Sequence, residues 1–194
     1  DLGAEVTVVE MESRILPVED EEISAQARKQ FERQGIQIVT SATVAELDRG
    51  ENGVVAKVQR EGEETLSVSA ERVILAVGIV GNVEDLGLET TGVKIDRGHI
   101  VTDDWCETDE PGIYAIGDVA TGVMLAHKAT HEGEICAEVI AGHAAFNDAR
   151  TIPAVVFTDP EIAVAGLMEN EATDKGYTIK VGKVPFAAIG RALT

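Results

Sequence analysis

The sequence predicts an α/β protein whose last part changes to an α+β pattern. Three observations indicate this class. Continuous apolar, β-branched runs occur at residues 6–10 and 71–78, as is typical of parallel strands that are covered on both faces. A segment with helical spacing separates the first run from a short apolar run at 36–39. From Pro153 onward, short strands and an acidic helix replace this order.

The first part is expected to contain a strand–helix–strand unit with an antiparallel insertion. Apolar residues at 23, 27 and 31 predict a helix over 20–34 that Gly35 ends, and the 36–39 strand follows it. Gly-rich turns separate three further runs, which predict antiparallel strands at 43–47, 53–60 and 65–68. The 71–78 run then predicts a buried parallel strand that closes the sheet.

The second part begins with loops and short strands between residues 79 and 108. An apolar run at 112–119 contains Gly117-Asp118 and predicts a strand, and a helix over 126–141 begins near Leu125. A stripe along one side of this helix predicts close packing against a neighbouring element: Ala129, Gly133, Ala137 and Ile140. Strands at 155–157 and 178–184 are expected on either side of an acidic helix that begins at Glu169.

Composition excludes several classes of protein. The 194 residues are 44% hydrophobic and 26% charged, which are values of a globular chain. The net charge of −19 argues against a nucleic-acid partner, because phosphate binding needs a basic surface. The acidic surface indicates a solvated face, and adaptation to high salt is the alternative. No apolar run reaches the 18 or more residues of a membrane-spanning helix.

The cysteines and histidines favour neither a disulfide framework nor a metal site. Cys106 and Cys136 lie far apart and have no metal-ligand spacing, so we expect reduced, buried thiols and a cytoplasmic location. His127 and His131 are four residues apart on the predicted helix, but the sequence offers no third ligand. They are interpreted as residues of the helix surface.

Glu10 stands at the tip of the first strand. In a Rossmann-type unit, an acid about 20 residues after the glycine-rich fingerprint binds the ribose hydroxyls of NAD. If Glu10 is that acid, the fingerprint lies roughly 10 residues before residue 1. We therefore expect the chain to be an internal piece of a longer enzyme. The alternative is that Glu10 is an ordinary exposed acid after a strand.

Gly117-Asp118 and the segment Met124-Leu125-Ala126-His127-Lys128-Ala129 carry the strongest signal. The Asp118 carboxylate can accept hydrogen bonds from sugar or ribitol hydroxyls, and the N-terminus of the following helix favours an anionic group. Both segments resemble the flavin-binding motif of the disulfide-linked pyridine nucleotide oxidoreductases. The Leu-Ala-His-Lys-Ala version is similar to the dihydrolipoamide dehydrogenase branch of that family.

The resemblance extends over essentially the whole chain and implies two cofactors, FAD and NAD. It implies that Asp118 binds the flavin ribitol and that the backbone of residues 124–127 lies against the flavin ring, which assigns FAD to Met124, Leu125, Ala126 and His127. It also implies NAD contacts at three positions: Glu10, Val44 and Gly78. Val44 and Gly78 are equally well explained as packing residues.

The resemblance further implies three parts: partial Rossmann-type NAD- and FAD-binding domains followed by the start of an α+β dimerisation (interface) domain. These are the second half of the NAD domain at 1–80, a central region with the returning FAD segment at 81–149, and the interface domain from 150 to 194. The family's redox-active cysteine pair and its C-terminal His-Glu pair have no counterpart here. No catalytic residue is therefore assigned.

The implied activity is the oxidation of protein-bound dihydrolipoamide with NAD⁺ as acceptor, by a homodimer that meets the lipoyl domains of 2-oxo acid dehydrogenase or glycine cleavage complexes. Two alternatives stay open. One is another member of the family, such as a mercuric or glutathione reductase. The other is a flavin electron-transfer or binding module without disulfide chemistry, although the pattern after Pro153 counts against it.

Overall fold

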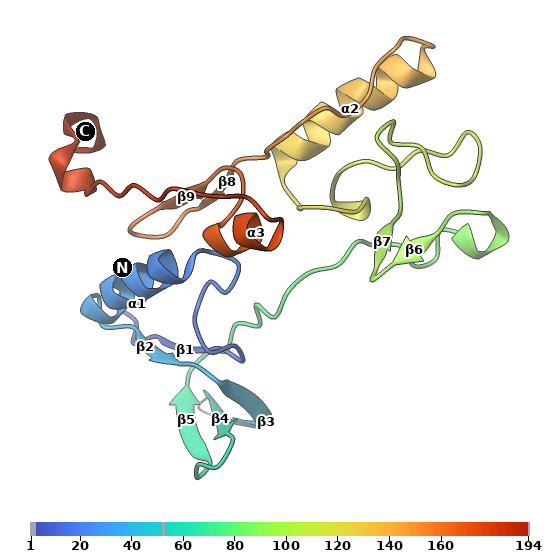
Figure 1. Ribbon diagram of the computed structural model, residues 1–194. Coiled ribbons are helices and arrows are strands. Elements are labelled where there is room, and N and C mark those ends of the chain that lie inside the picture. The colour runs from blue at the N-terminus through green and yellow to red at the C-terminus, as the bar shows by residue number, and fades with distance from the viewer. Residues whose placement is uncertain (1–2, 52, 194) are drawn as a thin grey trace. The chain divides into compact units, whose positions relative to one another are not determined.

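The computed structural model describes residues 3–51 and 53–193 and separates into two compact units (Figure 1). The first unit comprises Asp1–Val73, Val156–Ile162 and Leu167–Thr194. The second comprises Ile74–Val155 and Ala163–Gly166. Each unit has its own helices and strands.

The first unit opens with the strand–helix–strand arrangement that the sequence predicts. Strands β1 (Thr7–Val9) and β2 (Gln37–Val39) pair in parallel, with Val8 opposite Ile38, and helix α1 (Glu21–Arg33) connects them. Acidic residues fill the first turn of α1 and Arg33 its last turn, as the helix dipole favours. Gly35 follows the helix with a φ of +89°, a left-handed conformation that glycine adopts without strain.

A three-stranded antiparallel meander follows, as predicted. It contains β3 (Ala42–Gly50), β4 (Gly53–Arg60) and β5 (Leu66–Ala70), with β4 in the centre. Val58 of β4 is almost fully buried. The pairing of β3 with β4 shifts register between Val44 and Glu46, which marks a bulge next to a predicted cofactor residue.

The second unit is built around helix α2 (Ala126–Ile140), which begins within one residue of the predicted position. One buried cluster contains Ile100 and Ala120 beside the short strands β6 (Ile95–Asp96) and β7 (His99–Ile100). A second cluster joins Ile135 of α2 to the two cysteines. Single 3-10 turns occupy Leu88–Thr90 and Gly117–Val119.

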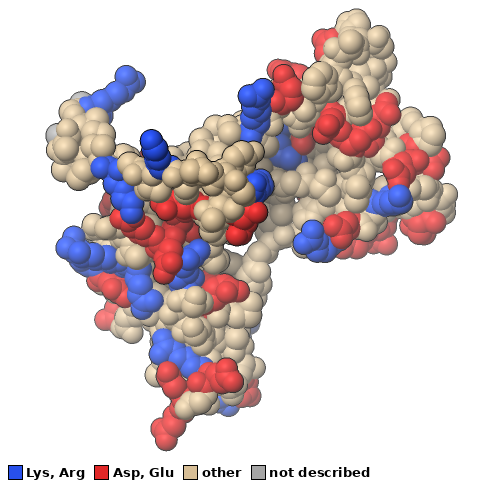
Figure 2. All heavy atoms as spheres, in the orientation of Figure 1, with Lys and Arg blue, Asp and Glu red and all other residues tan. Residues whose placement is uncertain are grey.

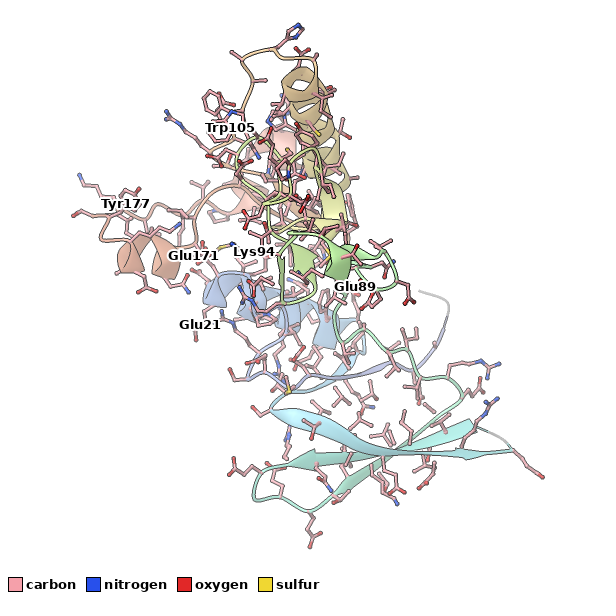
Figure 3. All side chains as sticks on the ribbon, turned by 90° about the vertical axis from the view of Figure 1, so that its right-hand side faces the viewer. Glu21, Glu89, Lys94, Trp105, Glu171 and Tyr177 are labelled. Carbon is pink, nitrogen blue, oxygen red and sulfur yellow. The ribbon has the colours of Figure 1, made fainter. Side chains whose placement is uncertain are left out.

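The last part of the chain contains β8 (Ala154–Val156) and β9 (Ile162–Val164), which form a two-stranded sheet, and helix α3 (Glu169–Asp174). Short 3-10 helices follow at Phe186–Ala188 and Gly190–Leu193. Within the first unit, the Glu169 backbone N–H donates to Asp20 Oδ1 over 3.2 Å. Glu21 of α1 and Glu171 of α3 mark the acidic first turns of these two helices (Figure 3).

Three predicted strands are wrong as elements of this structure. Residues 71–78 are irregular, and Ile74 and Val77 are 89% and 92% exposed. In the 112–119 run only an isolated bridge between Glu107 and Tyr114 forms, and residues 178–184 are unpaired. A strand needs a hydrogen-bonded neighbour. Among the residues that the structure describes, none lies beside these runs in a regular ladder.

The predicted packing stripe of α2 is half correct. Ala129 and Gly133 pack against the segment before the helix: a Cβ on Gly133 would stand 3.4 Å from Ile116 Cδ1. Ala137 and Ile140 are instead exposed. The buried side of the helix carries Lys128, Glu132, Ile135 and Cys136. It therefore includes two charged residues that the sequence interpretation did not place there.

The charge pattern matches the composition. Acidic and basic side chains are interspersed over the face drawn in Figure 2, and several of them form exposed ion pairs, such as Lys57 with Glu46 and Asp48. Exposed pairs of this kind contribute little to stability, because water and salt screen them. Within the described residues, no helix is both long enough and apolar enough to traverse a bilayer.

Candidate functional site

The first candidate site is the turn that precedes helix α2. Gly117 is buried and has a φ of +72°, a backbone conformation that residues with a Cβ atom rarely adopt. A Cβ at this position would stand 3.1 Å from the Cβ of Ala129 on α2. Glycine is thus needed both for the turn and for the close approach of the helix.

Asp118 follows Gly117 in the same 3-10 turn, and its side chain is exposed. Its carboxylate forms no hydrogen bond or ion pair with the part of the chain that the structure describes. Gly81 lies behind the turn, because a Cβ there would approach the Val119 Cα to 3.1 Å and the Asp118 backbone oxygen to 3.3 Å. The turn is backed by protein, and the carboxylate of Asp118 is available to a ligand.

A buried ion pair holds the backbone of Gly117. Lys128 Nζ lies 3.0 Å from Glu132 Oε1, and the two side chains are only 4% and 10% exposed. The Gly117 N–H donates to Glu132 Oε2 over 2.8 Å, while its carbonyl accepts from Lys128 Nζ over 3.2 Å. The Cys106 thiol donates to the Glu132 carbonyl over 3.6 Å. One turn of α2 thus contacts both polar groups of the Gly117 backbone, and the Gly117 carbonyl also accepts from the Ala120 N–H over 3.1 Å.

Met124, Leu125, Ala126 and His127 form the entry to α2. Leu125 is the N-cap residue, and no side chain caps the helix there. The free backbone N–H groups of the first turn therefore keep their capacity to donate to a ligand. His127 is exposed, and its Nε2 lies 2.7 Å from the Pro153 carbonyl within the same unit. Asp118 and residues 124–127 belong to one unit, as the motif requires.

The second candidate site lies at the carboxyl ends of β1 and β2 in the first unit. The Glu10 N–H donates to the Val39 carbonyl over 2.8 Å, which extends the parallel pairing to the strand tip. Glu10 Oε1 accepts from the Glu12 N–H over 2.8 Å. This bond fixes the direction of the carboxylate. In open α/β sheets this edge is where ligands bind.

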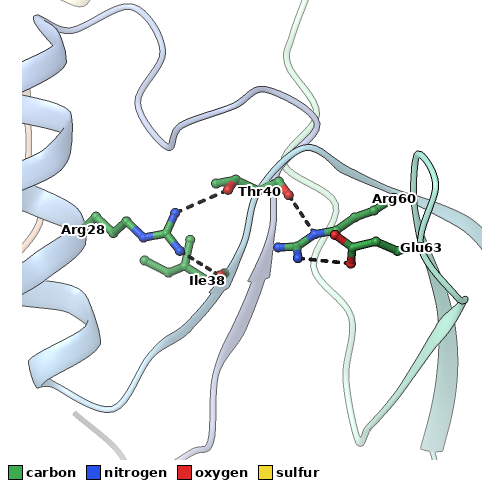
Figure 4. A network of polar contacts seen from close by, with 5 residues as sticks. All are labelled: Arg28, Ile38, Thr40, Arg60 and Glu63. Atoms are coloured by element: carbon green, nitrogen blue, oxygen red, sulfur yellow. Dashed lines mark hydrogen bonds and ion pairs between the residues drawn. The ribbon is translucent and has the colours of Figure 1, made fainter.

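A pocket of about 510 Å³ adjoins this strand tip, and its lining is mostly polar: Met11, Thr40, Ser41, Arg60, Glu61 and Glu63. Figure 4 shows how Thr40 is held from two sides. Arg28 donates to Thr40 Oγ1 over 3.3 Å, and Arg60 Nε donates to the Thr40 carbonyl over 3.0 Å. Arg60 also pairs with Glu63 at 3.4 Å. Two acids and one base give the lining a net negative charge.

The resemblance implies that Val44 and Gly78 contact the same cofactor as Glu10, and these two residues lie in different units. Val44 lies on β3 in the same unit as Glu10, with 43% of its surface exposed, just before the bulge. Gly78 belongs to the other unit, where it is exposed and has a φ of +111°. Their roles in cofactor binding remain predictions.

The two cysteines are free and buried, as predicted. Among the described residues, no group of three potential His, Cys, Asp or Glu ligands is arranged for a metal ion. Burial, followed by the negative charge of Glu132, raises the pKa of the Cys106 thiol to about 11. Both effects disfavour the thiolate, which is the reactive form of cysteine.

We therefore expect Cys106 to resist alkylation in the folded full-length protein. At pH 8 a thiol with this pKa is about 0.1% thiolate, so iodoacetamide labelling of Cys106 should be at least ~10-fold slower than in urea. Because the folded pKa lies above the ordinary 9.0, the associated stability is present below pH 9 and lost as pH rises through about 11. Peptide mass spectrometry measures the labelling. Equal rates in folded and unfolded protein would contradict the burial.

Sequence reasoning missed the Lys128–Glu132 pair and the arginines around Thr40. The four-residue spacing of Lys128 and Glu132 on a predicted helix is a recognisable ion-pair signal. What hid it is the expectation that charged residues face solvent. Arg60 stands at the end of β4, and only the meander brings it to Thr40.

Comparison with protein families gives two matches. The model of the pyridine nucleotide-disulphide oxidoreductase family matches residues 1–133. The model of the dimerisation domain of the same family matches residues 152–194.

Curated relatives carry the name dihydrolipoyl dehydrogenase. The chain is 46% identical to the one from Rhizobium etli, covering 99% of this chain and 40% of the relative, and 41% identical to the one from Geobacillus stearothermophilus, covering 100% and 41%. It is similar to the crystal structure of LpdA from Mycobacterium tuberculosis, with a TM-score of 0.86 and 29% identity over 99% of this chain and 41% of that one. The HOCl-induced flavoprotein disulfide reductase RclA from Escherichia coli gives a TM-score of 0.84 at 27% identity, over 97% and 43%.

Proposed function

Because the chain belongs to the pyridine nucleotide-disulphide oxidoreductase family, we propose that the full-length protein is a flavoprotein that oxidises protein-bound dihydrolipoamide with NAD⁺ as acceptor. The support is the 40–46% identity to several proteins named dihydrolipoyl dehydrogenase. The chain spans about 40% of the length of these relatives, so the proposal concerns the protein of which these residues form a part.

The observation that carries the proposal is the turn at Gly117 and Asp118. The turn offers an exposed carboxylate that is free to accept hydrogen bonds, on a backbone that only glycine allows. These residues fit the ribitol chain of FAD, whose hydroxyl groups are donors. When bound, FAD accepts two electrons from a dithiol and passes them as hydride to NAD⁺.

The entry to α2 complements this carboxylate. The 15-residue helix presents uncapped backbone N–H groups at Ala126 and His127, and its dipole places partial positive charge there. Reduced flavin is anionic around its pyrimidine edge. A helix N-terminus stabilises such a charge without reorganising, which supports placing Met124–His127 against that edge.

The strand tip at Glu10 supports a site for the adenosine ribose of NAD. The carboxylate is aligned by the Glu12 N–H and can accept from both ribose hydroxyls. The adjoining pocket contains Glu61 and Glu63 against Arg60, which is already bound to Thr40 and Glu63. This net negative lining opposes a 2′-phosphate, so we propose NAD rather than NADP as the nicotinamide cofactor. We also propose NAD contacts at Val44 and at Gly78.

Changing Glu10→Ala in the full-length protein should lower kcat/KM for NADH about tenfold, since it removes a charge-assisted acceptor for the ribose hydroxyls. The value for NADPH should change less, so the gap between the two cofactors narrows. Glu12→Ala is the matched control, because it removes a charge two residues away without a proposed ribose contact. An unchanged ratio of the two kcat/KM values in Glu10→Ala would exclude this role.

The match to the dimerisation domain supports a homodimer, and the names of the relatives support lipoyl domains as partners. We also propose that residues 1–80 belong to the NAD domain, residues 81–149 to the central region with the returning FAD segment, and residues 150–194 to the interface domain. The free cysteines favour a reducing compartment, so we propose a cytoplasmic location.

The deciding experiment is to purify the full-length protein, determine its FAD content and measure NAD⁺ reduction by dihydrolipoamide. NADPH-dependent reduction of glutathione disulfide and of Hg²⁺ are the comparison assays. We expect bound FAD and a kcat/KM for dihydrolipoamide that exceeds the other two by at least ~100-fold, corresponding to about 2.7 kcal/mol in transition-state binding. Higher activity in either comparison assay would reassign the substrate, and a protein without FAD would overturn the proposal.

A further inference from the structure

We propose that Lys128 and Glu132 are positioning residues that hold the Gly117–Asp118 turn in the conformation that retains FAD. This inference rests on the proposed function, because it takes Asp118 as the residue that binds the flavin. Neither side chain is assigned a contact with the cofactor. Both act through the backbone of Gly117.

Lys128 and Glu132 hold the backbone of Gly117 from both sides, and we call this ion pair the clamp. Glu132 accepts the Gly117 N–H and Lys128 donates to the Gly117 carbonyl, while the two side chains pair with each other at 3.0 Å. Since both peptide groups that flank Gly117 are held, the φ and ψ of this residue are restrained. These two angles, together with the φ of Asp118, set the direction in which the Asp118 side chain leaves the turn.

The burial of the two side chains indicates that this ion pair has a structural role. The side chains of Lys128 and Glu132 are 4% and 10% exposed, and removing two charges from water is costly. An apolar pair of similar size would fill the space at less cost, but it could not hydrogen-bond Gly117. The buried Gly117 N–H would then lack a partner, which is itself unfavourable, and the Gly117 carbonyl would keep only the Ala120 N–H at 3.1 Å.

The surroundings fix the clamp in place. Glu132 is held through its own carbonyl by the Cys106 thiol, and a Cβ on Gly122 would lie 3.2 Å from Lys128 Cε. The Lys128 amine would lie 3.7 Å from the same Cβ, so the loop between Asp118 and α2 packs against the lysine side chain. The amine of Lys128 is therefore confined between the loop, the helix and the turn.

The test measures FAD release from the full-length protein, followed as the rise in free-flavin fluorescence well below each variant's unfolding temperature. Glu132→Ala removes the acceptor of the Gly117 N–H and should speed release about tenfold. Glu132→Gln keeps an acceptor oxygen and should stay within about threefold of the unchanged protein. Ile135→Ala is the matched control, because it removes a buried side chain of the same helix that does not contact Gly117. It should lower the unfolding temperature without faster release.

The outcomes separate the clamp from stability and from the flavin assignment. Equal release from Glu132→Ala and the unchanged protein would overturn the clamp, and so would equally fast release from Ile135→Ala. If Glu132→Ala does not fold, Lys128→Met decides, since it keeps the apolar stem and should release FAD about fivefold faster. FAD release from Asp118→Ala is measured in the same way. Fast release from Asp118→Ala, together with unchanged release from the Lys128 and Glu132 variants, would refute the clamp alone. Unchanged release from Asp118→Ala would refute the flavin site as well.

Discussion

Asp118→Ala is expected to leave the purified full-length protein largely without FAD. The change removes a carboxylate that no other described residue engages, so its loss should cost the cofactor and spare the fold. A hydrogen bond to a charged group contributes about 1.5–3 kcal/mol, which corresponds to an affinity about 10- to 150-fold weaker. The ratio of flavin absorbance to protein absorbance after gel filtration measures this loss.

Two further variants make the result specific to the carboxylate at this position. Asp118→Asn keeps the size and one acceptor oxygen, so it should retain more FAD than Asp118→Ala. Glu134→Ala removes an exposed acid from α2 and should retain FAD fully. Full and tightly bound flavin in Asp118→Ala would remove Asp118 from the site.

Local patterns predicted the elements whose partners lie nearby in the sequence. Helix α1 follows from its apolar spacing, and the meander follows from the turns between its strands, because each strand pairs with the next along the chain. In each case the determining interactions are short in sequence.

The wrong predictions share a physical cause. They concern residues whose contacts are made with parts of the chain that are distant in sequence. The 71–78 run has the composition of a buried strand, but composition does not supply the neighbouring ladder, and Ile74 stays exposed here. For Lys128 and Glu132 the error was the opposite one: they were expected to be exposed, because charged residues are seldom buried unless paired, but they are buried. Their partner is the backbone of Gly117, 11 and 15 residues away, and backbone groups carry no sequence signal.

Residues 1–194 produced alone are expected to self-associate and to show no dihydrolipoamide-dependent NAD⁺ reduction. Several large apolar side chains are open to solvent, among them Ile74 at 89%, Val77 at 92% and Phe157 at 83%. Apolar groups exposed along an unpaired, extended segment favour association with other chains. The two cysteines are buried and their thiolates disfavoured, so they cannot serve as a redox-active pair.

This expectation is measurable by light scattering, by binding of the dye ANS and by titration with FAD. Strong ANS fluorescence, masses above the 20.6 kDa of a monomer and less than one FAD per chain are the expected results. The double variant Ile74→Lys/Val77→Lys should reduce both scattering and dye binding, because it places charges where the apolar run is most exposed. A monomer that binds one FAD tightly, or any turnover of dihydrolipoamide, would mean that these residues already form a complete site and that the catalytic groups lie among them.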